Sequence, residues 1–272
     1  MLVFAAPAAA GALLSARDVA LSAVAAIMFT LCASGGYLLN DALDVESDRV
    51  HPSKRFRPVA SGRISVPLAR LAGTALTVVA VAGGWLLAGW QLAVVLTVYA
   101  VVTLAYSAYL KRIPVLELLV VTSGFLLRTL AGAVAVDVPI SRWFLIVTGF
   151  GSLYLVAGKR HAEVTALGGE GSRHRAVLAA YPALYLRQTR ELSASVSLLG
   201  YCLWAFSGEA ASMPWSILSV IPVTFGMLRY GLILELGKGD APEEIFLRDG
   251  PLIIALAGWL LLFLLSVAKV GA

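Results

Sequence analysis

Three aspartates stand close together between residues 40 and 65, in a chain that is otherwise apolar for long runs. Asp41, Asp44 and Asp48 are spaced three and four residues apart, which places them on one face if this segment is helical. Asn40 precedes them and adds a neutral oxygen. Because like charges on one face repel, and because carboxylate and amide oxygens suit Mg²⁺, the pattern predicts a magnesium site that binds a diphosphate. The alternative is a solvated helix end whose acids are balanced by the cations that follow.

A cluster of cations comes directly after the aspartates. Prolines and a glycine between residues 51 and 63 predict a loop. Lys54, Arg55 and Arg57 lie in it, and an arginine fork binds phosphate oxygens in pairs while lysine acts as a point charge. Topology-setting charge or binding to anionic lipid headgroups would also explain these cations. Beside the carboxylates, phosphate binding is favoured.

Other polar residues stand at the end of an apolar stretch or inside one. Tyr106 and Lys111 end one stretch, where a ligand site and an aromatic, basic membrane boundary explain them nearly equally well. Arg128 lies near the middle of another stretch, where a charge is costly and should face a partner or a water-filled cavity. We therefore favour a site role for Arg128, with Glu117, Asp137 or the motif acids as candidate partners.

A second basic motif follows a later apolar stretch. Lys159 and Arg160 stand beside Glu163, and Lys159 and Glu163, four residues apart, would support a helix even without a ligand. Arg187 borders the same polar segment and is a weaker candidate. Pro242, with acids after it, predicts a helix start.

Membrane helices must position all of these residues. The chain is 60% hydrophobic and 14% charged, whereas about a quarter of the residues in a soluble domain are charged. Apolar runs of about 20 residues, the length that spans a bilayer, recur along it. We expect an all-α polytopic protein, one domain over residues 1–272 with about nine transmembrane helices. The predicted spans are 2–14 (the later part of a first helix), 19–39, 68–87, 91–109, 115–136, 143–157, 192–206, 214–236 and 251–267.

Charge asymmetry orients these spans. Short cytoplasmic loops carry an excess of lysine and arginine, and the loops after the second, fourth, sixth and eighth predicted spans hold most of the cations, among them Arg49, Arg63, Arg112, Arg173, Arg175, Arg190, Lys238 and Arg248. We expect a multi-pass protein of the cell membrane whose acidic motif faces the cytoplasm. Because topology accounts for the net charge of +5, we do not expect nucleic-acid binding.

These motifs together resemble a known family. Asn40-Asp41-x-x-Asp44-x-x-x-Asp48 resembles the first aspartate-rich motif of the UbiA superfamily of membrane prenyltransferases. The segment Tyr106-Ser107-x-x-Leu110-Lys111-Arg112 is similar to the motif at the end of that superfamily's fourth helix. The resemblance covers nearly the whole chain. It implies a nine-helix bundle with a cavity open to the cytoplasm and to the lipid, and Mg²⁺ as the cofactor.

Two departures from the family pattern carry information. Typical members have a second aspartate-rich motif after the sixth helix, where this chain has Lys159-Arg160-His161-Ala162-Glu163. With the basic loop after Asp48, this resembles one branch, the decaprenyl-phosphate phosphoribosyltransferases. Members usually have a basic and aromatic segment before the first helix, whereas this chain begins at Met1-Leu2-Val3-Phe4. We therefore expect a truncated first helix.

The resemblance implies substrates and roles. The substrates would be phosphoribosyl pyrophosphate and a polyprenyl phosphate, in the synthesis of cell-wall arabinan precursors. The implied metal ligands are Asn40, Asp41, Asp44 and Asp48, the three aspartates acting in catalysis with Lys159. The implied substrate-binding residues are Asn40, Lys54, Arg55, Arg57, Tyr106, Lys111, Arg128, Arg160, Glu163 and Arg187.

Two alternatives stay open. One is a UbiA-type prenyltransferase that joins a prenyl diphosphate to an aromatic or other acceptor. The other is a lipid-binding or transport protein, although the polar residues gather at one face, whereas a transporter should have midplane sites in broken helices. The polyprenyl length and the oligomeric state, including a homo-oligomer, stay open as well.

Overall fold

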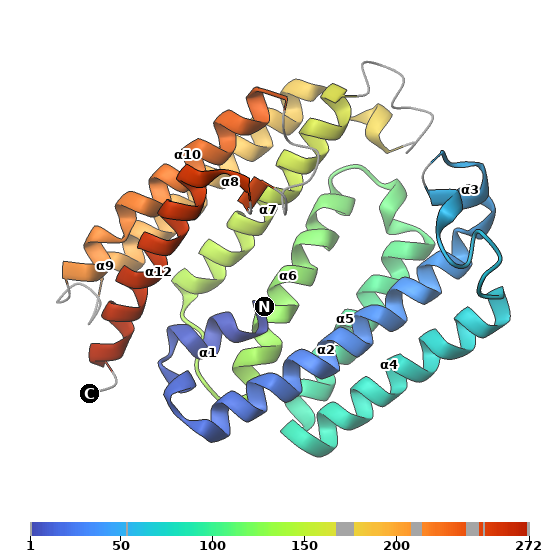
Figure 1. The fold of residues 1–272 in the computed structure, drawn as a ribbon, viewed down its shortest axis with the longest axis horizontal. Helices are drawn as coiled ribbons and strands as arrows, with labels where there is room; N and C mark the ends of the chain where they lie inside the picture. Colours follow the sequence, from blue (N-terminus) through green and yellow to red (C-terminus); the bar gives the residue numbers. More distant parts are fainter. Residues whose placement is uncertain are drawn as a thin grey trace. The chain divides into compact units, whose positions relative to one another are not determined.

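A computed structural model of the chain describes residues 2–52, 54–166, 177–207, 214–237, 245–246 and 248–270. Every regular element in these ranges is a helix, so the all-α prediction is confirmed (Figure 1). The helices group into two compact units, Met1–Pro139 and Ile140–Ala272. Arg173, Arg175 and Lys238, and the helix start predicted at Pro242, lie outside the described residues.

Four long helices make up most of the first unit. They are α2 (Ala16–Leu43), α4 (Val66–Ala88), α5 (Trp90–Ala108) and α6 (Leu116–Ala135). The shorter elements are η1 (Leu2–Phe4), α1 (Ala5–Ala9), η2 (Ala12–Leu14), α3 (Val45–Val50), η3 (Lys54–Phe56) and η4 (Leu110–Arg112). The helix predicted over 2–14 is wrong as a continuous element, because Gly11, in the left-handed region with φ 69°, ends α1 and starts η2.

Local sequence sets the ends of the long helices. The side chain of Ser15 accepts a hydrogen bond from the backbone N–H of Asp18 and caps α2, and Ser65 caps α4 in the same way through the N–H of Leu68. Gly89, with φ 96°, turns the chain between α4 and α5. The spans predicted over 68–87 and 91–109 therefore correspond to two helices joined by a tight turn.

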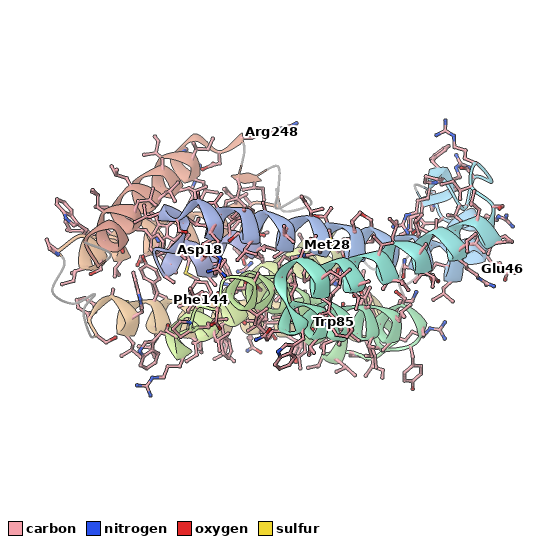
Figure 2. The ribbon with its side chains drawn as sticks, turned by 90° about the horizontal axis from the view of Figure 1, so that it is seen from below. Asp18, Met28, Glu46, Trp85, Phe144 and Arg248 are labelled. Carbon is pink, nitrogen blue, oxygen red and sulfur yellow. The ribbon has the colours of Figure 1, made fainter. Side chains whose placement is uncertain are left out.

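A contact between small residues brings α2 against α4. A Cβ atom added at Gly35 would lie 2.6 Å from the carbonyl oxygen of Gly73 and 2.6 Å from Oγ1 of Thr77, so the two backbones approach too closely for any side chain. Phe29, Cys32 and Leu96 are buried in the core beside this crossing. Asp18 and Glu46 mark the two ends of the α2–α3 segment, with Met28 between them (Figure 2). This packing fixes the direction of the last turn of α2, which carries Asp41.

The second unit is built from α7 (Arg142–Ala166), η6 (Leu178–Ala180), α8 (Ala183–Ala205), α9 (Pro214–Leu218), α10 (Val220–Glu235) and α12 (Gly250–Val270). Aromatic rings fill its interior. Tyr230 lies with its ring centroid 5.4 Å from that of Tyr154 and 5.5 Å from that of Phe246. The hydroxyl of Tyr154 donates to the carbonyl oxygen of Met227 at 2.6 Å, so α7 and α10 are joined by a polar contact as well as by packing.

The membrane character of the chain is confirmed, and the helix count is not. Among the described residues, five helices are long and apolar enough to cross a membrane: Ala16–Leu43, Val66–Ala88, Trp90–Ala108, Leu116–Ala135 and Pro214–Glu235. Gly250–Ser266 is a shorter apolar helix. α8 starts at Ala183, before the span predicted over 192–206, so Arg187 and Arg190 lie on a helix rather than in the predicted loop.

Candidate active site

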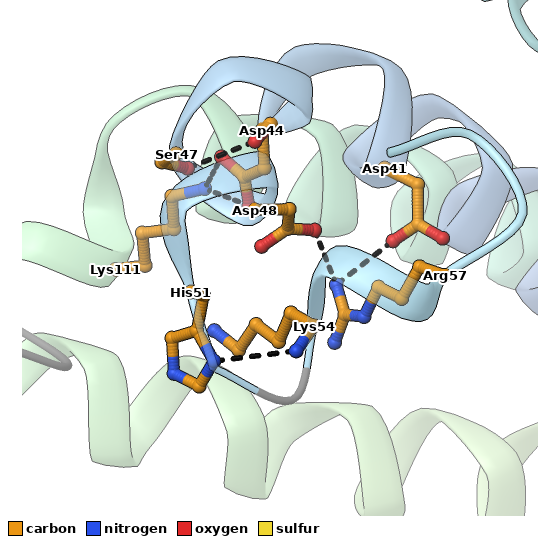
Figure 3. A network of polar contacts seen from close by, with 8 residues as sticks. All are labelled: Asp41, Asp44, Ser47, Asp48, His51, Lys54, Arg57 and Lys111. Atoms are coloured by element: carbon orange, nitrogen blue, oxygen red, sulfur yellow. Dashed lines mark hydrogen bonds and ion pairs between the residues drawn. The ribbon is translucent and has the colours of Figure 1, made fainter. Parts of the chain in front are cut away.

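The aspartates lie on both sides of a bend between α2 and α3. α2 ends at Leu43, and Asp44, with φ −94° and ψ 4°, joins it to α3. The backbone N–H of Asp48 donates to the carbonyl oxygen of Asp44 at 2.8 Å, so the helical hydrogen-bond spacing continues across the bend. The side chains of Asp41, Asp44 and Asp48 therefore stay on neighbouring turns, as the spacing predicted (Figure 3).

The loop after α3 is anchored by a small apolar cluster. Val59 is 1% exposed and packs with Ala42 of α2 and Ala69 of α4. The N–H of Ser61 donates to the carbonyl oxygen of Arg57 at 2.9 Å, closing a turn around this anchor. Because its backbone is held in this way, the loop presents its cations from a fixed base.

Arg57 bridges two of the three aspartates. Its Nη1 donates to Oδ1 of Asp41 and to Oδ2 of Asp48, each at 2.9 Å (Figure 3). The side chain of Asp48 is only 4% exposed, whereas that of Arg57 is 38% exposed. A buried carboxylate needs a counter-ion, so the negative charge of Asp48 depends on this guanidinium.

Lys111 reaches the third aspartate from the other side. Its Nζ lies 2.5 and 2.7 Å from the two carboxylate oxygens of Asp44 (Figure 3). Lys111 belongs to η4, and a tight turn follows: Val115 has φ 66° and ψ −49°, and the N–H of Leu116 donates to the carbonyl oxygen of Pro114 at 2.7 Å. This is the geometry of a γ-turn, which is rare and strained for a β-branched residue. The turn sets where α6 begins after the lysine.

The remaining predicted residues of this unit lie nearby but differ in what they contact. The carbonyl oxygen of Asn40 accepts from the N–H of Asp44 at 2.9 Å. The backbone N–H of Lys54 donates to Nδ1 of His51 at 3.3 Å (Figure 3). The guanidinium carbon of Arg55 lies 4.8 Å from the ring centroid of Phe56, so this arginine faces a neighbour on the loop. Tyr106 is half-buried near the end of α5.

The donor set suits Mg²⁺ in its chemistry, since three carboxylates and an amide offer only hard oxygen ligands. In the ion pairs of the described residues, Arg57 and Lys111 face the three carboxylates. Within the described part of the chain, however, no group of three or more His, Cys, Asp or Glu side chains is arranged to hold a metal ion. Arg57 instead contacts one oxygen each of Asp41 and Asp48, and Lys111 contacts both oxygens of Asp44.

Arg128 does not have the acidic partner expected for it. Within the described residues no ion pair joins it to Glu117, Asp137 or the aspartates. Its guanidinium carbon instead lies 5.4 Å from the ring centroid of Phe29, 5.9 Å from that of Tyr99 and 5.6 Å from that of Phe125. Cation–π attraction to three rings takes the place of the predicted counter-ion.

The second basic motif lies on α7, in the other unit. Nη1 of Arg160 donates to Oε2 of Glu163 at 2.9 Å, so Glu163 pairs with Arg160 rather than with Lys159. Lys159 is half-buried. Nε of Arg187 donates to Oε1 of Glu191 at 2.9 Å on the surface of α8. Both hydrogen bonds lie within the second unit.

Sequence reasoning missed a buried polar cluster in this second unit. Nη2 of Arg190 donates to Oε1 of Glu235 at 2.6 Å, and Arg190 is 4% exposed. His161 is also buried, and its Nδ1 finds no hydrogen-bond partner among the described residues. Burial lowers the pKa of His161, and the positive charge of Arg190 lowers it further. Arg190 and Glu235 are far apart in the sequence, so only the packing of α8 against α10 could reveal this pair.

The sequence model of the UbiA prenyltransferase family matches residues 1–249. The chain belongs to this family. Among the relatives of this UbiA-family chain, the decaprenyl-phosphate phosphoribosyltransferase of Mycobacterium tuberculosis strain H37Rv is 43% identical over 249 residues, which cover 92% of this chain and 80% of the relative. The protein of the same name from Corynebacterium glutamicum is 38% identical, over 98% of this chain and 82% of the relative.

Solved structures agree on the fold. A UbiA homolog from Archaeoglobus fulgidus, bound to GPP and Mg2+, superposes with a TM-score of 0.73 at 15% identity, covering 98% of this chain and 95% of that chain. At this identity the likeness establishes the fold alone. A UbiA fold is therefore confirmed for a chain whose apolar helices make it a multi-pass membrane protein.

Proposed function

We propose that this UbiA-family protein transfers the 5-phosphoribosyl group of phosphoribosyl pyrophosphate to a polyprenyl phosphate and releases pyrophosphate. The observation that carries the proposal is the common name of the relatives, decaprenyl-phosphate phosphoribosyltransferase, at 38–43% identity over most of the chain. The acidic and basic residues gathered around Asp48 support it, since they suit a substrate rich in phosphate.

The reaction makes few demands on proton transfer. The bond from the anomeric carbon to the pyrophosphate oxygen breaks, and an oxygen of the lipid phosphate forms a new bond to the same carbon. A phosphate monoester is already anionic near neutral pH, so it attacks without a strong general base. Catalysis then depends on holding the two substrates in line and on stabilising the charge of the leaving group.

The acidic motif is assigned to the metal. Asn40, Asp41, Asp44 and Asp48 would hold Mg²⁺, which would neutralise charge on the pyrophosphate as it leaves. The cations of the same unit, Lys54, Arg55, Arg57 and Lys111, would bind phosphate oxygens directly, with Tyr106 beside them. Arginine suits the terminal phosphate groups because its fork binds two oxygens at once.

The basic second motif is assigned to the phosphate groups that the metal would not bind. Lys159, Arg160 and Arg187 would bind the 5-phosphate of the sugar and the phosphate of the lipid, with Glu163 orienting Arg160 through their hydrogen bond of 2.9 Å. Arg128 would orient a group deeper in the membrane. A basic motif at this position suits a reaction in which the diphosphate belongs to the water-soluble donor and the acceptor is a monophosphate.

The decisive experiment supplies purified protein with labelled phosphoribosyl pyrophosphate, decaprenyl phosphate and Mg²⁺. The expected product is a lipid-extractable sugar phosphate, formed together with pyrophosphate and lost when EDTA removes the metal. A parallel reaction contains geranyl diphosphate and an aromatic acceptor, because a fold neighbour is bound to GPP and Mg2+. Prenylated acceptor without any lipid-linked sugar phosphate would establish the prenyltransferase alternative instead.

Replacing Asp48 tests the acidic motif. We expect Asp48→Asn to lower the transfer rate at least 100-fold, because the amide keeps the shape of the side chain and removes the charge that a metal needs. Folding should survive, since Arg57 keeps its hydrogen bond to Asp41 at 2.9 Å. Transfer rate and thermal unfolding are measured on the same preparation, with Glu46→Gln, an exposed acid of the same helix, as the control. Near wild-type transfer by Asp48→Asn would contradict the metal assignment.

A further inference from the structure

Arg57 and Lys111 contact the carboxylates that are proposed to bind the metal. Nη1 of Arg57 sits between Oδ1 of Asp41 and Oδ2 of Asp48, 2.9 Å from each. Nζ of Lys111 contacts both oxygens of Asp44. A magnesium ion binds oxygens at about 2.0–2.1 Å. An ion placed between Oδ1 of Asp41 and Oδ2 of Asp48, or against both oxygens of Asp44, would therefore take the place of Nη1 or Nζ.

The burial of Asp48 restricts the order in which Arg57 can leave and a metal ion can arrive. The side chain of Asp48 is 4% exposed, and a carboxylate so buried is strongly disfavoured without a positive partner. Arg57 can therefore leave Asp48 only when another cation replaces it. A metal ion alone would displace the guanidinium of Arg57 and leave it without an acidic partner. A metal ion that arrives with a diphosphate brings phosphate oxygens, which can accept hydrogen bonds from the displaced guanidinium.

The two side chains can move while their backbones remain in place. Those of Arg57 and Lys111 are 38% and 21% exposed, so both reach solvent. The loop that carries Arg57 is held by the burial of Val59, and Lys111 stands on η4 before the tight turn at Val115. Rotation of two long side chains is enough to change their partners.

We propose that Arg57 and Lys111 are exchangeable counter-ions. In the free protein they pair with Asp41, Asp44 and Asp48, and they pass to the phosphate oxygens when a diphosphate enters together with a divalent cation, which takes over the carboxylates. This rests on the proposed function, because it assumes the diphosphate site. It makes metal and diphosphate binding mutually dependent: each should tighten the other by the same factor.

Binding measurements test the exchange without any turnover. Mn²⁺ is titrated into the purified protein and followed by electron paramagnetic resonance, with and without inorganic pyrophosphate. We expect weak Mn²⁺ binding to the free protein and at least tenfold tighter binding with pyrophosphate. Lys111→Met and Arg57→Gln should each bind Mn²⁺ at least fivefold more tightly than the unmodified protein when pyrophosphate is absent, and should lose at least tenfold in affinity for pyrophosphate with Mn²⁺.

Arg63→Gln is the matched control, because it removes one positive charge from an exposed position of the same loop, and Arg63 makes no ion pair among the described residues. If Arg63→Gln tightens Mn²⁺ binding as much as Arg57→Gln does, the gain is general electrostatics and the exchange is wrong. The exchange is also wrong if both Arg57→Gln and Lys111→Met bind Mn²⁺ no better than the unmodified protein.

A folding defect in Arg57→Gln would not end the test. Lys111→Met reports on the more exposed Asp44, whose side chain is 25% exposed, and Mn²⁺ should raise the unfolding temperature of Arg57→Gln more than that of the unmodified protein. The proposed function and the exchange can fail separately. Loss of phosphoribosyl transfer with the expected Mn²⁺ data would overturn the function alone, and transfer without the Mn²⁺ changes would overturn the exchange alone.

Discussion

Arg128 shows how a charge can lie inside an apolar helix without an acid beside it. Three aromatic rings surround its guanidinium, with centroids 5.4 to 5.9 Å away. Ring faces attract the cation by roughly 0.5–2 kcal/mol each, but they accept few of the five N–H bonds that an arginine can donate. The rings therefore hold the guanidinium in place while most of its N–H donors stay available. Such donors suit an anionic group of a substrate.

Two substitutions at this position separate binding from packing. We expect Arg128→Met to reduce transfer at least tenfold, because the substitution removes the positive charge and the N–H donors. Little thermal stability should be lost, because methionine also packs well against aromatic rings. Arg128→Lys should retain part of the activity, since it keeps the charge and loses the fork. Transfer rate and unfolding temperature decide the matter. Full activity in Arg128→Met together with a lower unfolding temperature would make Arg128 a structural residue.

His161 gives a pH dependence of stability with a defined sign. Burial lowers its pKa, Arg190 and Arg187 lower it further, and Glu235 and Glu191 oppose the shift. As the pH falls, the unfolded chain, with an ordinary histidine pKa of about 6.5, takes up the proton before the folded protein does. The contribution of neutral His161 is therefore complete above about pH 6.5 and is lost as the pH falls from there through the folded-state pKa.

Thermal unfolding in detergent between pH 7.5 and 5 measures this contribution. The fall in unfolding temperature on acidification should be smaller in His161→Gln than in the unmodified protein. His51→Gln, a loop histidine in the other unit, serves as the control and should keep the full fall. If His161→Gln also keeps it, then other groups cause the acid sensitivity.

The residues of the first site could be predicted better than their pairings. Spacing alone placed Asp41, Asp44 and Asp48 together, because helical periodicity survives the bend at Asp44. The same spacing could not show that Arg57 lies between two of them, since this depends on the fold of a loop anchored by Val59. Pairing between distant residues is a property of packing.

At the scale of helices, the crossing of α2 and α4 determines where the aspartates point. A Cβ atom at Gly35 would lie 2.6 Å from the backbone of α4 at Gly73, so Gly35→Ala must push the helices apart. Alanine favours a helix over glycine by about 1 kcal/mol, yet we expect a net loss of about 1–3 kcal/mol from overpacking. Transfer should fall as well, because Asp41 follows on the same helix.

Gly258→Ala is the matched control for this prediction. It is also a helical glycine in an apolar helix, and a Cβ atom there meets nothing within 4 Å. We expect its unfolding temperature to equal or exceed that of the unmodified protein. Equal stability of Gly35→Ala and Gly258→Ala would mean that α2 and α4 adjust freely to the added methyl group.

Helix ends were predictable where the apolar stretch and the helix coincide. This is so for α4 and α5, where Ser65 and Gly89 mark the boundaries. It fails for α8, which begins at Ala183, before the apolar run, because Arg187, Arg190 and Glu191 find partners on α8 itself or on α10. Polar residues that pair across helices extend a helix beyond the part that hydropathy detects.

For the whole molecule, composition predicts the class of protein more securely than the number of its spans. Five described helices meet the length and hydropathy of a membrane span, while α7 and α8 are long helices whose polar ends dilute their apolar parts. The UbiA fold agrees with the predicted architecture. The predicted count of about nine, from the length criterion, and the predicted single domain over residues 1–272 stay predictions.

The orientation of the protein in the membrane can be predicted from its charges and measured. The loop with Arg57 and the turn at Gly89 lie at opposite ends of α4, whose 23 residues give a length of about 35 Å, enough to cross a bilayer. Because lysine and arginine gather on the loop side, we propose that this side faces the cytoplasm, where phosphoribosyl pyrophosphate would be available.

Single cysteines at the two ends of α4 test the orientation. In a background with Cys32→Ala and Cys202→Ala, Phe56→Cys occupies a site that is 67% exposed on the loop, and Gln91→Cys lies just beyond the opposite turn. A membrane-impermeant maleimide should label Gln91→Cys in intact cells and Phe56→Cys only in inverted vesicles. The reverse pattern would put the acidic motif outside the cell, away from a water-soluble donor made in the cytoplasm, and would contradict the proposed substrate as well as the topology.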